Sequence, residues 1–174
     1  ARLNDLFKFS KKHKIKLASI EDLISYRLRY EKLIIKKDSK SFNLKNFDKM
    51  ILHNYENKLE NNINFVITKG KFNKNSSIYV RVLSTQIKKD VLKNKKIFQS
   101  LKLLNKYKNF LLLIINKKDN SDKSNIITLR YYGIGAQIIK DLNVKNMILI
   151  SRRKKKIIGL EGFGLKIKKQ IIIK

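Results

Sequence analysis

The segment NFLLLIIN, with an unbroken apolar run from Phe110 to Ile115, constrains the fold more than any other stretch of this chain. A strand without alternating polar residues is apolar on both faces, so a layer of structure must cover each face. The run has the length of a strand, and no apolar run in the chain approaches the roughly 18 residues that cross a bilayer. The sequence therefore predicts a central strand in a layered fold, and no membrane span.

Alternating side chains predict further strands around this run. In INFVIT, the residues Ile63, Phe65 and Ile67 recur at every second position, which is the period of a strand. KMILHNYENKLENNINFVITKG is predicted to form two strands around an Asn-rich turn, and SIYVRVLS, NMILIS and LKIKKQIII one strand each. KKIFQSLKLLNKY and YGIGAQIIKDLNV have apolar residues at helical spacing. We therefore expect an α/β fold (mixed α+β), with a mixed sheet and flanking helices.

A smaller helix–strand–helix piece is predicted ahead of this sheet. Its first helix, in RLNDLFKFSKKH, has three apolar residues on one face: Leu3, Leu6 and Phe7. KIKLA is predicted as a short strand. Ser19 then provides an N-cap, with Asp22 in the capping-box position, for a helix from about Ile20 to Tyr30. The polar, irregular stretch over 38–47 is predicted to be a linker.

The formal net charge of +29 would by itself favour a nucleic-acid binder. However, 35 of the 42 basic residues are Lys, and Lys, Ile and Asn together make up about 45% of the chain. These three residues have A- and T-rich codons, so an A+T-rich, reduced genome of the endosymbiont kind would enrich Lys at any solvent-facing position. A phosphate-binding surface more usually recruits Arg and aromatic residues. We interpret the charge as a solvated, Lys-rich surface.

RNA binding stays an alternative hypothesis. Its one hint is the pair Tyr131 and Tyr132 beside Arg130, with Arg152 and Arg153 elsewhere in the sequence. The alternative predicts a contiguous positive face with exposed aromatic residues, and an affinity that falls steeply with salt.

The chain has no cysteine, which excludes a disulfide framework and a thiolate metal site. Its two histidines, His13 and His53, are far apart in sequence, so a dedicated metal centre is not expected. No signal peptide is visible, and we expect a cytoplasmic protein. The chain starts ARLNDLFKF without an initiator Met, and it is therefore expected to be cut from a longer protein.

Two segments resemble known enzyme families. Residues 1–31 resemble the C-terminal end of 3,4-dihydroxy-2-butanone 4-phosphate synthase, where an A-R-L-x-D-L start, a K-I-x-x-I-x-D-L-I centre and a Y-R end recur. Residues 48–174 resemble the GTP cyclohydrolase II domain through VRVLS, YYGIGAQIIKDLNVKNMILIS and IIGLEGFGLKI. The two domains occur in this order in bifunctional riboflavin-biosynthesis proteins. The resemblance implies a synthase tail over 1–37, a linker over 38–47 and a cyclohydrolase-like domain over 48–174.

The cyclohydrolase family holds zinc with three cysteines, and the metal activates a water that attacks the purine ring. The resemblance places these cysteines in TQIKKDVLKNKK. There Gln86 occupies the first cysteine position, and no Cys, His or carboxylate cluster replaces the other two. The family's long R-Q-E-G-R-G-I-G-L stretch has also been lost, since only 13 residues separate LLLIIN from Arg130. We therefore predict a degenerate domain that has lost its zinc; an active cyclohydrolase with an altered site is the alternative.

Three residues match substrate-contacting positions of the family and are vestigial candidates for binding. Arg130 matches the Arg before Y-G-I-G, Ser151 stands for a Thr, and Lys156 matches a Lys. The glycine clusters are interpreted as scaffold. Gly133 and Gly135 are predicted to open a helix from Ile134, where glycine permits close packing. Turns before the last strand are predicted at Gly159, Gly162 and Gly164.

The synthase family converts ribulose 5-phosphate to 3,4-dihydroxy-2-butanone 4-phosphate and formate, using Mg or Mn with acidic residues and a histidine. In the family these residues lie upstream of the segment that matches Ala1. We therefore expect no catalytic residue, metal ligand or cofactor in this chain. The resemblance implies that a preceding domain binds the sugar phosphate, that the protein is a homodimer, and that the cyclohydrolase-like domain is structural.

Overall fold

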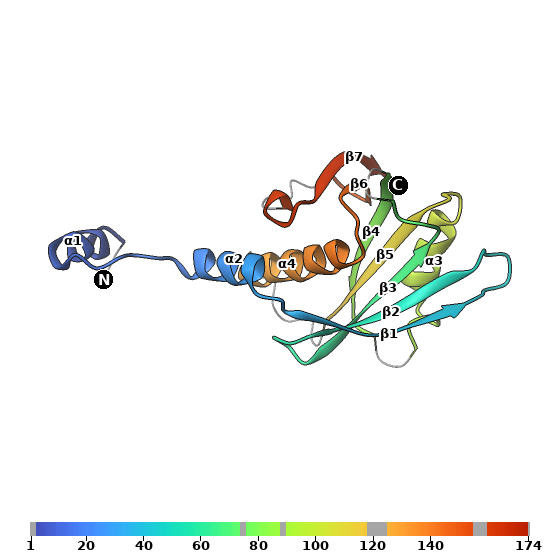
Figure 1. Ribbon diagram of the computed structural model, residues 1–174, viewed down its shortest axis with the longest axis horizontal. Coiled ribbons are helices and arrows are strands. Elements are labelled where there is room, and N and C mark those ends of the chain that lie inside the picture. Colours follow the sequence, from blue (N-terminus) through green and yellow to red (C-terminus); the bar gives the residue numbers. More distant parts are fainter. Residues whose placement is uncertain (1–2, 74–75, 88–89, 118–124, 155–159, 174) are drawn as a thin grey trace.

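The computed structural model of the chain describes residues 3–73, 76–87, 90–117, 125–154 and 160–173. Within these ranges the chain forms a seven-stranded sheet in the order β1-β2-β3-β5-β4-β6-β7 (Figure 1). The pairs from β1 to β5 are antiparallel and the pairs from β5 to β7 are parallel. The strands are β1 (Ile34–Phe42), β2 (Met50–Asn57), β3 (Asn62–Lys69), β4 (Ser77–Thr85), β5 (Phe110–Asn116), β6 (Asn146–Ser151) and β7 (Lys166–Ile172).

Helices cover both faces of this sheet. The described elements are α1 (Leu3–His13), α2 (Ile20–Tyr30), α3 (Lys95–Leu104), α4 (Asn125–Asp141) and the short 3₁₀ helix η1 (Leu160–Phe163). Figure 1 shows α2 and α4 side by side on one face and α3 on the other. None of the helices in the described ranges combines the length and apolar content that crossing a membrane requires.

Strand β5 occupies the centre of the sheet and contributes to both cores. Leu111, Leu113 and Ile115 pack in the core beneath α2 and α4. Phe110, Leu112 and Ile114 pack in the core beneath α3, with Ile97, Leu101 and Leu104 of that helix. Because successive side chains of a strand point to opposite faces, an unbroken apolar run supplies both layers at once. The predicted central strand and the mixed α/β fold are confirmed.

Helix α4 begins at Asn125, so the prediction that Gly133 and Gly135 open this helix was wrong. Both glycines lie inside it and permit close packing. A Cβ built on Gly133 would lie 2.5 Å from Leu28 Cδ1 of α2, and one on Gly135 would lie 3.2 Å from Leu113 Cδ2 of β5. The helix continues through both glycines, because packing against the sheet outweighs the low helix propensity of glycine.

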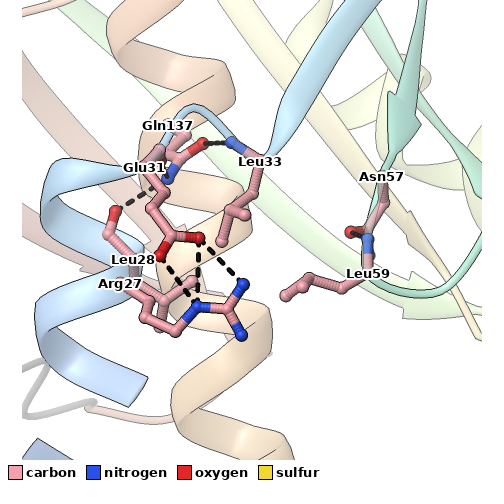
Figure 2. A network of polar contacts seen from close by, with 7 residues as sticks. All are labelled: Arg27, Leu28, Glu31, Leu33, Asn57, Leu59 and Gln137. Atoms are coloured by element: carbon pink, nitrogen blue, oxygen red, sulfur yellow. Dashed lines mark hydrogen bonds and ion pairs between the residues drawn. The ribbon is translucent and has the colours of Figure 1, made fainter. Parts of the chain in front are cut away.

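Gln137 of α4 joins this helix to the end of α2 and the start of β1 (Figure 2). Its Nε2 donates to the carbonyl oxygens of Leu28 at 2.7 Å and Glu31 at 2.8 Å, and its Oε1 accepts from the Leu33 amide at 3.0 Å. The last carbonyls of a helix have no partner within the helix. One amide side chain thus caps α2 and fixes the turn that leads into the sheet.

The N-terminal piece differs from its prediction at one element. Ser19 caps α2, with a reciprocal contact to Asp22, as the sequence predicted. The predicted strand KIKLA does not form; residues 15–19 are irregular, and Lys14, which follows the end of α1, has a φ of 54°. A strand needs a partner, and no strand of the described residues pairs with this segment. No side chain of α1 is buried, and Figure 1 shows this helix apart from the sheet.

The prediction of an irregular segment over 38–47 was wrong in its first half, because β1 extends to Phe42 and pairs with β2. Most β1 side chains are exposed, so the strand lacks the alternation by which a sequence reveals a strand. An edge strand with polar and Lys side chains is a common way to end a sheet, since it discourages further pairing. The strand crosses the predicted boundary between residues 37 and 38, and the domain limits stay a prediction.

The sequence predicted turns at Gly159, Gly162 and Gly164, which precede β7. Gly164 adopts a φ of 73° and ends η1 just before β7, which is the turn expected of it. Gly162 lies inside η1, and Gly159 lies outside the described residues.

Candidate functional site

A cavity of about 570 Å³ lies at the carboxyl ends of the parallel strands β4 and β6, and residues of α3 and α4 complete its walls. The chain runs from β4 through α3 to β5 on one face, then through α4 on the other face to β6, on the opposite side of β4. The chain thus goes from β4 first to its neighbour β5 and later to β6, the neighbour on the other side. The boundary between β4 and β6 is therefore a topological switch point. Ligands of open α/β sheets bind at such points, and this volume suits a small organic molecule.

Arg81 of β4 brings a positive charge to the wall of this cavity. Its side chain is buried, and its Nε donates to Ser100 Oγ of α3 at 3.0 Å. Ser100 Oγ in turn donates to the carbonyl oxygen of Lys96 at 2.9 Å. Burial lowers the pKa of Arg81, and the positive charge of Arg152 lowers it further. The ion pairs among the described side chains do not include Arg81.

Three more basic residues line the cavity: Lys96, Arg152 and Arg153. Lys96 belongs to the first turn of α3, and the two arginines directly follow β6. All three are exposed, whereas Arg81 is not, so the positive charge extends from the rim into the interior.

The opposite wall is apolar and aromatic. Leu113, Met147 and Leu149 of the sheet line it from one side, and Tyr131 and Tyr132 of α4 from the other. Both tyrosines are half-buried, and the close approach of α4 at Gly135 holds that helix against the sheet. A cavity with a basic side and an aromatic side can hold an anion attached to a flat, apolar body.

Of the three residues predicted to contact a substrate, Ser151 lines this cavity. It ends β6, its side chain is buried, and its Oγ donates to the Arg153 carbonyl oxygen at 2.7 Å. The side chain of Arg130 and all of Lys156 lie outside the described residues, although the backbone of Arg130 is part of α4.

Sequence reasoning missed Arg81 and Ser100. The available signal was an Arg in the middle of the strand pattern SIYVRVLS, where a charge has to be buried or placed at a site. Ser100 gave no signal, because its role comes from its contact with Arg81 between α3 and β4.

Part of this fold, including much of the cavity, matches a known protein family. Residues 98–172, from α3 to the last strand, match the GTP cyclohydrolase II family. The chain carries a GTP cyclohydrolase II-like domain. The cavity of this domain is built by α3, α4 and β6, which belong to the matched range, together with β4 just before it.

Relatives of the cyclohydrolase II-like domain and its N-terminal piece are riboflavin-biosynthesis proteins. The chain is 31% identical to riboflavin biosynthesis protein RibBA of Aquifex aeolicus, an alignment that covers 100% of this chain and 50% of the relative. It is 30% identical to 3,4-dihydroxy-2-butanone 4-phosphate synthase of Photobacterium phosphoreum, over 96% of this chain and 51% of that protein. The chain thus spans about half the length of the curated relatives it matches.

A solved structure with the same fold is RibBX of A. baumannii, described as a two-domain 3,4-dihydroxy-2-butanone 4-phosphate synthase. It is 26% identical to this chain, with a TM-score of 0.73 over 99% of the chain and 50% of RibBX.

The donor groups of this domain do not fit the zinc of the cyclohydrolase family. The chain has no cysteine, and no three His, Asp or Glu side chains gather in the described part of the structure. In TQIKKDVLKNKK, where the resemblance implies the zinc segment, Gln86 is exposed and Val91 is buried in the core beneath α3. Zinc sites of this type use thiolate, imidazole or carboxylate ligands, and this stretch instead contributes an apolar side chain to the core.

Proposed function

We propose that this chain is the C-terminal half of a riboflavin-biosynthesis protein whose activity is that of 3,4-dihydroxy-2-butanone 4-phosphate synthase. A domain preceding this chain would convert ribulose 5-phosphate to the four-carbon phosphate and formate with Mg²⁺ or Mn²⁺. The cyclohydrolase II-like domain would not convert GTP. That the protein is a homodimer stays a prediction.

The observation that carries this proposal is the zinc segment. A hydrolytic zinc site needs three protein ligands and an open position for water. The matching stretch provides no thiolate, and Val91 from it packs with Ile97 and Leu101 of α3. Reactivation would therefore require this part of the core to be rebuilt, and not only one side chain to be restored.

The relatives support the pairing of a synthase with such a domain. RibBX, which matches this chain over its length, is described as a synthase with two domains, and the relative from Photobacterium phosphoreum is also named as a synthase. Proteins named RibBA match over the same range. The distinction between a working and a silent second domain therefore has to come from the residues of this chain.

The test is to incubate the full-length protein with ribulose 5-phosphate and Mg²⁺, and separately with GTP and Zn²⁺, and to measure formate. We expect formate from the sugar phosphate and none from GTP. A GTP cyclohydrolase II that carries the three zinc cysteines, assayed in parallel, controls the GTP arm. Formate from GTP would overturn the proposal of a silent domain, and no formate from the sugar phosphate would overturn the synthase assignment.

A further inference from the structure

Helix α3 presents an aromatic ring and a lysine on the side that faces away from the core. The helix buries Ile97 and Leu101 against the sheet, whereas Phe98 is 37% exposed. The Nζ atom of Lys102, one helical turn later, lies 5.1 Å from the centre of the Phe98 ring. Phe47, from the segment between β1 and β2, packs against the same ring, with 5.9 Å between the ring centres. A second aromatic residue thus positions the Phe98 ring, and an exposed lysine lies over it.

A second ring and lysine follow directly after α3. Tyr107 stacks on Tyr79 of β4, with 3.7 Å between the ring centres and 14° between the ring planes. The Nζ atom of Lys106 lies 5.2 Å from the centre of the Tyr107 ring. Both tyrosines pack against the core beneath α3, so they lie on the same face of the sheet as this helix. We call Phe98, Lys102, Lys106 and Tyr107 the α3 surface.

The charge around the α3 surface has one sign. Over 91–117 the chain carries seven lysines and no acidic residue. Strand β7 adds Lys169, which pairs with Ile148, and Ile148 pairs with Tyr79. Side chains of directly paired residues point to the same face of a sheet, so the exposed Lys169 lies on the α3 side. An anionic partner is therefore attracted to this side of the molecule.

Codon bias alone does not account for this arrangement. A bias that enriches lysine acts at every solvent-facing position, but it gives no reason for lysines to lie over aromatic rings or for acidic residues to be missing beside them. The ion pairs among the described residues involve no lysine of α3 or of the segment that follows it. These lysines are thus available to a partner.

The α3 surface is separate from the cavity at the carboxyl ends of β4 and β6. None of its four residues lines that cavity. Tyr79, on which Tyr107 stacks, lies near the amino end of β4. The tyrosines that the sequence singled out as a hint of RNA binding, Tyr131 and Tyr132, line the cavity instead. The inference therefore goes beyond the proposed function and does not depend on whether the domain converts GTP.

The chemistry of the α3 surface matches a single nucleic-acid strand. Proteins that bind single strands combine a positive surface, which follows the phosphates, with aromatic rings on which the bases stack. Each ring here has a lysine beside it, as each base of a strand has a phosphate beside it. The contact between an exposed lysine and a ring is weak, so a base can replace the lysine on the ring while the ammonium group binds a phosphate. An acidic protein would match the charge and leave the rings without a function.

We propose that the α3 surface binds single-stranded RNA. Bases stack on Phe98 and Tyr107, and Lys102, Lys106 and Lys169 bind the phosphates. The binding does not depend on the base sequence, because neither stacking nor phosphate contacts distinguish the bases. A duplex keeps its bases inside its own stack and cannot place them on these rings, so it binds less well.

The experiment uses the full-length protein and a fluorescent single strand of about twelve adenylates, a length within the range of single-strand binding sites. Fluorescence anisotropy measures binding, with an RNA duplex of the same length and inorganic polyphosphate as competitors. We expect saturable binding of the single strand below about 10 μM at low salt, at least fivefold tighter than that of either competitor. The logarithm of the binding constant should fall linearly with the logarithm of the salt concentration.

A pair of lysine variants assigns the binding to the α3 surface rather than to the Lys-rich surface as a whole. Lys102→Gln removes one phosphate contact, and it should weaken binding about fivefold at low salt and make the salt dependence less steep. Lys140→Gln is the matched control, because Lys140 is an exposed lysine in the last turn of α4, on the other face of the sheet (Figure 1). It should change the affinity less than twofold.

A pair of variants at one position separates stacking from charge. Phe98→Leu keeps an apolar side chain and removes the ring, and it should weaken binding about fivefold without changing the salt dependence. Phe98→Tyr keeps the ring and should bind within about twofold of the wild-type protein.

Three results would each overturn the inference: the duplex or polyphosphate binds as tightly as the single strand, Lys102→Gln and Lys140→Gln have equal effects, or Phe98→Leu binds as the wild-type protein does. The α3 surface would then be a solvated, Lys-rich surface like the rest of the molecule. The formate assays from ribulose 5-phosphate and GTP test the proposed function independently, whichever result is found.

Discussion

At the scale of single residues, some buried polar groups of the sheet connect neighbouring strands through their side chains. His53 of β2 is one example: its Nδ1 lies 2.8 Å from Ser39 Oγ of β1, and its Nε2 lies 2.9 Å from Thr68 Oγ1 of β3. Desolvation lowers the pKa of this histidine to about 4, and the charge of Lys36 adds to the effect. The ring is therefore neutral in the folded protein at neutral pH.

This lowered pKa predicts acid destabilisation. Between pH 6.5 and about 4, the unfolded chain binds a proton at His53 that the folded chain does not bind. The free energy of unfolding should therefore fall as the pH falls through this window, by up to about 1.4 kcal/mol per pH unit. Urea unfolding at a series of pH values measures this dependence of the free energy of unfolding on pH.

A matched pair of variants isolates the histidine. His53→Gln should flatten the pH dependence between pH 6.5 and 4, because the titrating group is gone. His13→Gln is the matched control for the substitution itself, since His13 is exposed at the end of α1. Equal pH profiles for the wild-type protein and His53→Gln would contradict the assignment.

Gln137 gives a second prediction at this scale. Gln137→Glu replaces a donor by a carboxylate that faces the carbonyl oxygens of Leu28 and Glu31. The loss of two hydrogen bonds and the repulsion of the oxygens should lower the free energy of unfolding by about 3 kcal/mol. Gln137→Met, which keeps the size of the side chain, should have a smaller effect of about 1 to 2 kcal/mol. Chemical denaturation compares the two, and a milder effect for the Glu variant would contradict the capping role.

At the scale of elements, the contact between α2 and α4 depends on the absence of a side chain at Gly133. A Cβ at this position would lie within 3 Å of three atoms of Leu28, which is itself buried. The close approach lets Gln137, one helical turn later, reach the backbone at the end of α2 (Figure 2).

This packing predicts a sign change in a double-mutant cycle. Gly133→Ala alone should destabilise the protein by about 1 kcal/mol, because overpacking outweighs the gain in helix propensity. In the background of Leu28→Ala, which leaves space at the contact, the same change should be neutral or stabilising. Thermal unfolding of the four proteins measures the coupling. Additive effects would mean that the two residues do not compete for the same space.

Some elements could be predicted from sequence and others could not, for physical reasons. The run through Leu112 revealed β5 because burial on both faces leaves no polar position. Strand β1 was not predicted at any of its residues, since it is an edge strand held by pairing with β2 and its side chains are mostly exposed. The start of α4 was missed because glycine usually marks an end of a helix, whereas here it marks a contact between helices.

Some residues of the candidate site could likewise be predicted from the sequence, and others could not. Ser151 was found because its motif position was recognisable, and it does line the cavity. Arg81 and Lys96 lie in different elements and meet only through the order β5-β4-β6 of the sheet and the placement of α3. A single sequence contains no signal that residues of two different elements line the same cavity.

At the scale of the whole molecule, the sheet with α2, α3 and α4 forms one layered unit, and α1 stands outside it. The side chains of α1 are not buried, and several of its apolar residues are exposed, among them Leu3 and Phe9. The unit should therefore be as stable without α1 as with it.

Chains that begin at residue 1 and at residue 19 should unfold at the same temperature within about 2 °C, since no buried side chain is lost from the described residues 3–18. The shorter chain keeps Ser19, which caps α2. A calorimetric scan of both chains is sufficient, and a clear loss of stability on truncation would show that α1 packs on the unit.

The account as a whole rests on the claim that the cyclohydrolase II-like domain does no chemistry on GTP. The most direct measurement supplies the full-length protein with zinc and with GTP labelled in the ring carbon that cyclohydrolases release, and follows labelled formate. The account predicts no release above the rate without enzyme, while the same preparation forms formate from ribulose 5-phosphate. Labelled formate formed in proportion to the protein would contradict it, because catalysis would then proceed without the cysteines that the family uses.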